Sequence, residues 1–169
     1  MLMIHYFKTL PILAVTFTLS TCTYAVADLT DAKSIPKPIL MMGLYCNSAL
    51  SALKNQFEAD PTAMPWKAVA GKKQEAIRYL LQKLDTSDGS YDKAIRDRAL
   101  SPEEARFIKF SAVHESMQWL NNIRLSCVSA DPQSTDYEAC LKESNSEIYK
   151  CYRQIIDAAQ TIIKLAPIK

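Results

Sequence analysis

The chain has 169 residues, of which 49% are hydrophobic and 22% are charged, and its formal net charge is +2. This apolar content suffices for a packed core, which excludes wholesale disorder, and the length suits one domain. Only three glycines are present. That is too few for the tight turns of a many-stranded sandwich or barrel, or for a glycine-rich phosphate loop. The near-neutral charge gives no electrostatic reason to expect nucleic-acid binding.

The first 27 residues have the pattern of a secretory signal peptide. An apolar run at residues 10–19 precedes a stretch of small residues that ends in Ala-Val-Ala at 25–27, and small side chains at these positions favour cleavage after Ala27. The run is short for a membrane anchor. An alternative is lipidation at Cys22, because residues 19–22 resemble a bacterial lipobox. We expect cleavage, export to the periplasm or the medium, and a single domain over residues 28–169.

Three helices are expected in the first half of that domain. Apolar residues recur at three- and four-residue steps from Pro38 until Asp60-Pro61, which ends the pattern. Pro65 then opens a second helix that runs to Leu84, with Trp66 on its inner side. The composition of residues 85–90, Asp-Thr-Ser-Asp-Gly-Ser, is typical of a turn. A short helix over residues 91–100 follows.

The clearest local signal is Ser101-Pro-Glu-Glu104, which predicts a capping box at the start of a helix running to about Val128. The apolar positions of this helix cover more than one stripe, which predicts a central helix that is packed from several sides. A polar connection, residues 129–136, leads to the last helix, where Thr135 and Glu138 are spaced as a second capping box. No β-type alternation is present, so we predict an all-α fold: a disulfide-braced helical bundle of four to five helices.

Four cysteines remain after cleavage at Ala27: Cys46, Cys127, Cys140 and Cys151. An even number in an exported chain predicts two disulfides. On one straight helix Cys140 and Cys151 would lie about 16 Å apart, although a break at residues 144–147 would remove this objection to their pairing. Antiparallel helices joined by the connection would bring Cys127 level with Cys140. We therefore favour the pairs Cys127–Cys140 and Cys46–Cys151 among the three possible connectivities.

Few side chains in the sequence suit catalysis or metal binding. His114 is the single histidine beyond the signal peptide, and an enzyme of the Ser-His or Cys-His type would have to use it as the base. The chain lacks the paired histidines or CxxC motifs of zinc sites, and the acidic stretch starting at Asp85 departs from a calcium loop at its fifth and twelfth positions. We expect neither a metal nor another cofactor.

By elimination, the sequence favours an exported, non-enzymatic binding protein with a protein partner. Our concrete hypothesis is an inhibitor or immunity-type protein that neutralises a toxic enzyme in the periplasm. Its binding residues should lie on exposed loops, which makes Asp88 and Tyr91 at the first turn and Asp131 in the connection the candidate partner contacts. An alternative is a carrier that holds a small apolar ligand in a cavity lined by four side chains of the long helix: Phe107, Phe110, Met117 and Trp119.

Overall fold

The structure, a computed structural model, describes residues 35–97 and 99–165. The expected signal peptide (1–27) and Cys22 lie outside these residues. Within the described part every regular element is a helix, which confirms the all-α prediction. The elements are α2 (Lys37–Ala59), the short 3-10 helix η3 (Trp66–Ala68), α3 (Lys72–Arg96), α4 (Pro102–Ser126), α5 (Thr135–Ser144) and α6 (Ser146–Leu165).

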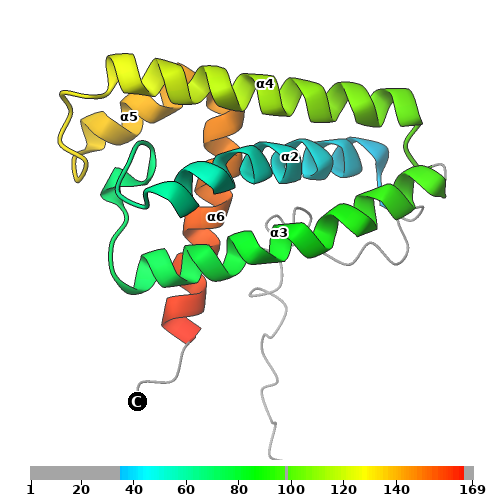
Figure 1. The fold of residues 1–169 in the computed structure, drawn as a ribbon, viewed down its shortest axis with the longest axis horizontal. Helices are drawn as coiled ribbons and strands as arrows, with labels where there is room; N and C mark the ends of the chain where they lie inside the picture. The colour runs from blue at the N-terminus through cyan, green and yellow to red at the C-terminus, as the bar shows by residue number, and fades with distance from the viewer. Residues whose placement is uncertain (1–34, 98, 166–169) are drawn as a thin grey trace, which may run out of the picture.

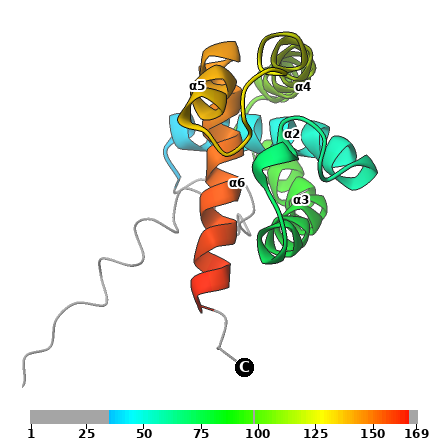
Figure 2. The same ribbon diagram turned by 90° about the vertical axis from the view of Figure 1, so that its left-hand side faces the viewer.

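Three long helices lie along the long axis of the molecule, and the last helix crosses them. In Figure 1, α4, α2 and α3 run across the view, whereas α6 descends steeply through it. Figure 2 shows α6 upright beside the other helices, with the short α5 near its upper end. Helix α2 contacts α4, α3 and α6. Helix α6 contacts α2, α3, α4 and α5, so α2 and α6 together connect the other helices.

Helix α3 contradicts the predicted turn at residues 85–90. The backbone of α3 is helical from Lys72 to Arg96 without interruption, so the expected turn and the separate helix over residues 91–100 are both wrong. Leu84 and Tyr91, which flank this segment, are both fully buried. Because they lie seven residues apart, they occupy the same side of a helix. Burial of both side chains outweighs the low helix propensity of the polar residues between them.

Pro65 also begins a different element from the expected α-helix. It precedes the single 3-10 turn η3, after which Gly71 adopts a positive φ of 54° just before α3. Trp66 therefore lies before α3 and enters the core from the loop that joins α2 to α3. Its side chain is fully buried between Phe57 and Tyr152, with ring centroids 5.0 and 5.2 Å away.

The helix starts are defined by local hydrogen bonds. The capping box of α4 is confirmed: the Glu104 amide donates to Ser101 Oγ at 3.1 Å, and the Ser101 amide donates to Glu104 Oε2 at 3.1 Å. The cap of α5 falls one residue before the predicted position, because Ser134 Oγ accepts from the amide of Tyr137. Asn145 interrupts the last helix, where its Oδ1 accepts from the first amides of α6.

Two disulfides fasten the helices together. Cys46 of α2 is joined to Cys151 of α6, with 5.1 Å between the Cα atoms, and Cys127 at the end of α4 is joined to Cys140 of α5, with 5.8 Å between them. These are the two pairs favoured above. The helix does break at Asn145, which would have allowed Cys140 and Cys151 to pair. Instead, Cys140 bonds to Cys127 of the neighbouring helix end, and Cys151 bonds to Cys46 of α2. Disulfides are typical of oxidising compartments.

Among the described residues no helix is both long enough and apolar enough to cross a membrane.

Candidate interaction surfaces

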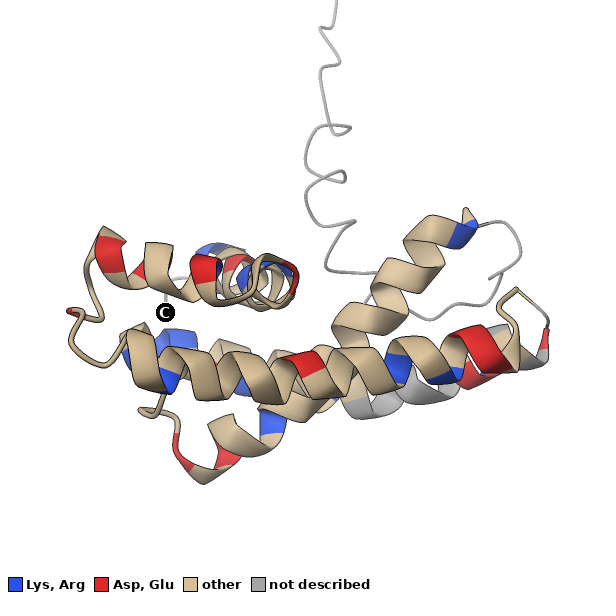
Figure 3. Cartoon of the chain, turned by 90° about the horizontal axis from the view of Figure 1, so that it is seen from above, with Lys and Arg blue, Asp and Glu red and all other residues tan. Residues whose placement is uncertain are grey.

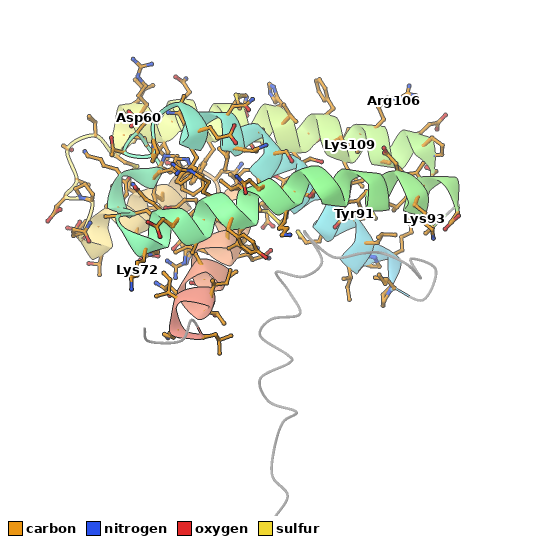
Figure 4. The ribbon with its side chains drawn as sticks, turned by 60° about the horizontal axis from the view of Figure 1, so that its bottom comes forward. Asp60, Lys72, Tyr91, Lys93, Arg106 and Lys109 are labelled. Carbon is orange, nitrogen blue, oxygen red and sulfur yellow. A yellow bond between two sulfur atoms is a disulfide. The ribbon has the colours of Figure 1, made fainter. Side chains whose placement is uncertain are left out.

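The first predicted partner-binding region is part of a helix and is partly buried. Because α3 continues through residues 85–91, no loop is available there to enter an enzyme cleft. Tyr91 is 1% exposed and belongs to a hydrophobic cluster with Leu44 and Ile108. Figure 4 shows Tyr91 on the part of α3 that lies beside Lys109 of α4. The backbone at Asp88 is helical, and the side chain of Asp88 lies outside the described part of the structure.

The second predicted region, which contains Asp131, is an exposed loop. We call residues 127–134 the α4–α5 connection. Asp131 is exposed and orders the loop around it: its Oδ1 accepts from the Gln133 amide at 3.0 Å, and its carbonyl accepts from the Ser134 amide at 2.9 Å and from Ser134 Oγ at 2.6 Å. The Cys127–Cys140 disulfide ties the first residue of the connection to the middle of α5. This bond and the hydrogen bonds of Asp131 restrict the shape of the loop, while Asp131 remains accessible.

A cavity of about 320 Å³ adjoins the connection. Pro132, Gln133 and Ser134 form one wall, and Lys73 and Arg153 are among the residues opposite. Arg153 pairs with Glu138 at 2.8 Å. Burial lowers the pKa of the Lys73 ammonium, and the positive charge of Arg153 lowers it further. Arg153 also pairs with Asp157 at 2.7 Å, so Lys73 is the cation of this cavity that a hydrogen-bonding or acidic group of a partner could contact.

Helix α4 carries a second accessible surface on the side away from the core. Its buried residues, among them Ala112, Trp119 and Ile123, face α2 and the core. On the opposite side of the helix, and in the turn that follows it, are large apolar side chains that we call the α4 outer stripe: Phe107, Phe110, Met117 and Leu125 of the helix and Val128 of the turn. The prediction that α4 is packed from several sides holds only in part: α2, α5 and α6 contact the helix, but Phe110, Val113 and Met117 of its second apolar stripe are exposed.

The charged groups of α4 leave much of this surface neutral. Figure 3 views the molecule from the α4 side, and the ribbon of α4 has long sections that carry neither charge. No charged residue occurs between Glu115 and Arg124. A groove of about 580 Å³ lies along the carboxyl-terminal half of the stripe, with Met117 and Val128 in its lining. Lys67 and Arg124 add positive charge to the groove.

The cavity expected for a small apolar ligand is not formed by the predicted residues. Phe107 and Phe110 are 72% and 70% exposed, and Met117 is also exposed. Trp119 is fully buried on the other side of α4, where its Nε1 donates to the Leu141 carbonyl at 2.8 Å. The side chains assigned to one cavity therefore point in opposite directions, into solvent and into a packed core.

Among the described residues, the neighbour that the structure gives His114 is the aromatic ring of Phe110. His114 is exposed on α4, and its imidazole stacks on the ring of Phe110, with centroids 6.1 Å apart. Within the described structure no serine or threonine hydroxyl is hydrogen-bonded to it, and all four described cysteines are in disulfides. In the same part of the chain no group of three or more His, Cys, Asp or Glu side chains could hold a metal ion.

A partly buried tyrosine and a carboxylate lie in another hollow, between α2, α4 and the start of α6. Tyr45 donates a hydrogen bond to Glu115 Oε2, and Met41, Met42 and Ile108 contribute apolar walls. Burial raises the pKa of the Tyr45 hydroxyl, and the hydrogen bond to Glu115 and the negative charges of Glu115 and Glu147 raise it further. The hydroxyl therefore stays protonated at neutral pH and acts as a donor.

Comparisons with protein-family models, with curated protein sequences and with solved structures find no match to this chain.

Proposed function

We propose that this protein is an exported, non-enzymatic binding protein of the inhibitor or immunity type, which neutralises a toxic enzyme in the periplasm. Its partner-contacting element is the α4–α5 connection, and Asp131 is the first contact residue. One observation carries the proposal: the connection is accessible, and a disulfide and its own hydrogen bonds restrict its shape.

A loop of this kind suits inhibition for a physical reason. Binding normally orders flexible groups, and the entropy lost on ordering reduces affinity. A loop whose shape is already restricted loses less entropy when it enters a cleft. The two disulfides also fit a protein that acts outside the cytoplasm, where thiols oxidise.

The proposal is tested by capturing partners from the exported fraction with three forms of the chain. The Asp131→Asn variant keeps the side-chain oxygen that accepts from Gln133 and removes the charge, so the loop keeps its shape. The matched control is Asp92→Asn. It removes the carboxylate of Asp92 on α3, which pairs with Lys109 of α4 at 3.2 Å. We expect one protein to bind the wild type and the control equally, and Asp131→Asn about tenfold or more weakly. Equal capture by all three forms, or none, contradicts the proposal.

A further inference from the structure

The α4 outer stripe is as extensive as the largest apolar patch of a typical monomer. Phe107, Phe110 and Leu125 each expose more than two thirds of their surface, and Met117 and Val128 add to them. Since a whole aromatic side chain presents about 150–250 Å², these residues together offer roughly 500 Å² of apolar surface per molecule. Apolar patches of that size are often functional. Together with the polar atoms that flank it, the stripe would supply most of the roughly 800 Å² that each partner buries in a standard interface.

The spacing of residues along the stripe is the same in both directions. From its amino-terminal end the positions are Phe107, Phe110, His114 and Met117, and from its carboxyl-terminal end they are Val128, Leu125, Asn121 and Gln118. At 100° per residue the positions within α4 fall within about 100° of the helix circumference, and Val128 lies in the turn just after the helix. A two-fold axis between residues 117 and 118 therefore places Phe110 beside Leu125 and His114 beside Asn121 of a second, antiparallel copy, with Phe107 towards the turn that holds Val128.

The two halves of the stripe also differ in shape in a complementary way. The amino-terminal half projects two phenyl rings into solvent, whereas the carboxyl-terminal half borders the groove of about 580 Å³. In the antiparallel register, Phe107 and Phe110 of each copy face the groove of the other. Lys67 and Arg124 beside the groove have no ion-pair partner among the described residues, and cations are attracted to the faces of aromatic rings.

The charges select the antiparallel direction. With the axis between residues 117 and 118, Arg124 of one copy lies beside Ser111 of the other, and Arg106 lies towards the turn that follows α4 of the other. A parallel pair in register would place each arginine beside its own equivalent, which is repulsive. A closed two-fold pair uses the same surface on both copies, so no apolar part of the stripe is left to recruit a third.

We propose that the occupant of the α4 outer stripe is a second copy of this chain, which forms an antiparallel two-fold dimer about residues 117 and 118. This inference does not depend on the proposed inhibitor function, because Asp131 is not a residue of the stripe, although Val128 belongs to both the stripe and the α4–α5 connection. The dimer presents two such connections.

The first test is sedimentation of the chain recovered after export, over a range of concentrations. The wild type should sediment as a dimer, and Phe110→Glu as a monomer with a dissociation constant at least about 30-fold higher. Tyr79→Glu is the matched control, because Tyr79 is a 52% exposed aromatic residue on α3, and it should stay dimeric. Far-ultraviolet circular dichroism verifies that each variant is folded.

Disulfide trapping tests the register. A Gln118→Cys variant places two thiols next to the axis and should form a covalent dimer on mild oxidation. Leu125→Cys places its thiols about 22 Å apart along the helices and should not. A monomeric wild type overturns the proposal, whether the stripe binds another protein or another segment of this chain. The proposal is also overturned if the Phe110→Glu variant remains dimeric. It is likewise overturned if Leu125→Cys forms the covalent dimer and Gln118→Cys does not.

Discussion

Cys46 and Cys151 are 105 residues apart in the sequence, and their Cα atoms are 5.1 Å apart in the structure. The bond joins α2, which contacts most of the other helices, to α6, which crosses them. Both cysteines are fully buried in the main hydrophobic cluster. This disulfide therefore links the first and last helices of the described chain inside its core.

The two disulfides should differ in their effect on stability. In the chain-entropy model, closing a loop of 105 residues stabilises the folded state by about 4.8 kcal/mol, and closing one of 13 residues by about 2.9 kcal/mol. The double variant Cys46→Ala/Cys151→Ala should therefore lose more free energy of unfolding than Cys127→Ala/Cys140→Ala, as measured by chemical denaturation. Equal losses, or the reverse order, would mean that loop length does not govern these bonds.

The two tryptophans provide a matched test of a buried hydrogen bond. Both are fully buried, but Trp119 Nε1 donates to the Leu141 carbonyl, whereas Trp66 Nε1 has no hydrogen-bond partner within the described structure. Replacement by Phe removes a similar volume at each site. Trp119→Phe should cost about 1–3 kcal/mol more than Trp66→Phe, because it leaves the Leu141 carbonyl unpaired. A greater loss for Trp66→Phe in thermal or chemical unfolding would contradict this assignment.

Acid should weaken the start of α4 through Glu104. The hydrogen bond from the Lys37 ammonium, at 2.6 Å, and those from Ser101 lower the pKa of this carboxyl to about 2. Because the folded-state pKa lies below the unfolded value, this contribution to stability is present at neutral pH. It is lost as the pH falls from about 4 towards 2.

Unfolding of the wild type and of Glu104→Gln across this pH range measures the effect. The stability difference between the two proteins should be largest at neutral pH and should shrink below pH 4 or so. Glu103→Gln is the control, since Glu103 makes no side-chain hydrogen bond or ion pair within the described structure. A difference that does not change with pH would show that Glu104 does not titrate as described.

Tyr91 should affect stability and not partner recognition. Its side chain is 1% exposed, so Tyr91→Ala should lower the free energy of unfolding by about 3–5 kcal/mol. Tyr79→Ala, on the exposed side of the same helix, should change it by no more than about 0.5 kcal/mol. If Tyr91→Ala were as stable as the wild type, then Tyr91 would be accessible, as the sequence alone suggested.

The features that local sequence determines were predicted well. The capping box at Ser101 needs only residues within one helical turn. The pair Cys127–Cys140 follows from two helix ends that a short connection brings level, and Cys46–Cys151 was then the remaining pair. The segment 85–90 was predicted wrongly because its polar composition favours a turn, whereas the helical outcome depends on burial of Leu84 and Tyr91 in the tertiary structure. Composition cannot show that burial.

The stripe on α4 illustrates the same limit. The spacing of Phe107, Phe110 and Met117 shows that the helix has a second apolar side, but spacing does not show whether another helix covers it. The structure shows that α2 packs against the opposite side and that this one is exposed. In the connection, the exposed position of Asp131 was predictable, whereas its hydrogen bonds to Gln133 and Ser134 were not.

The central claim is that the protein acts through its surface and not through a reactive side chain. The most direct measurement titrates this protein into the enzyme that it captures from the exported fraction and follows the turnover of that enzyme. The account predicts stoichiometric inhibition by the wild type and by His114→Ala, and weaker inhibition by Asp131→Asn. Two results would contradict the claim. One is that this protein itself turns over a substrate and that His114→Ala abolishes this turnover; the other is that this protein leaves the activity of the captured enzyme unchanged.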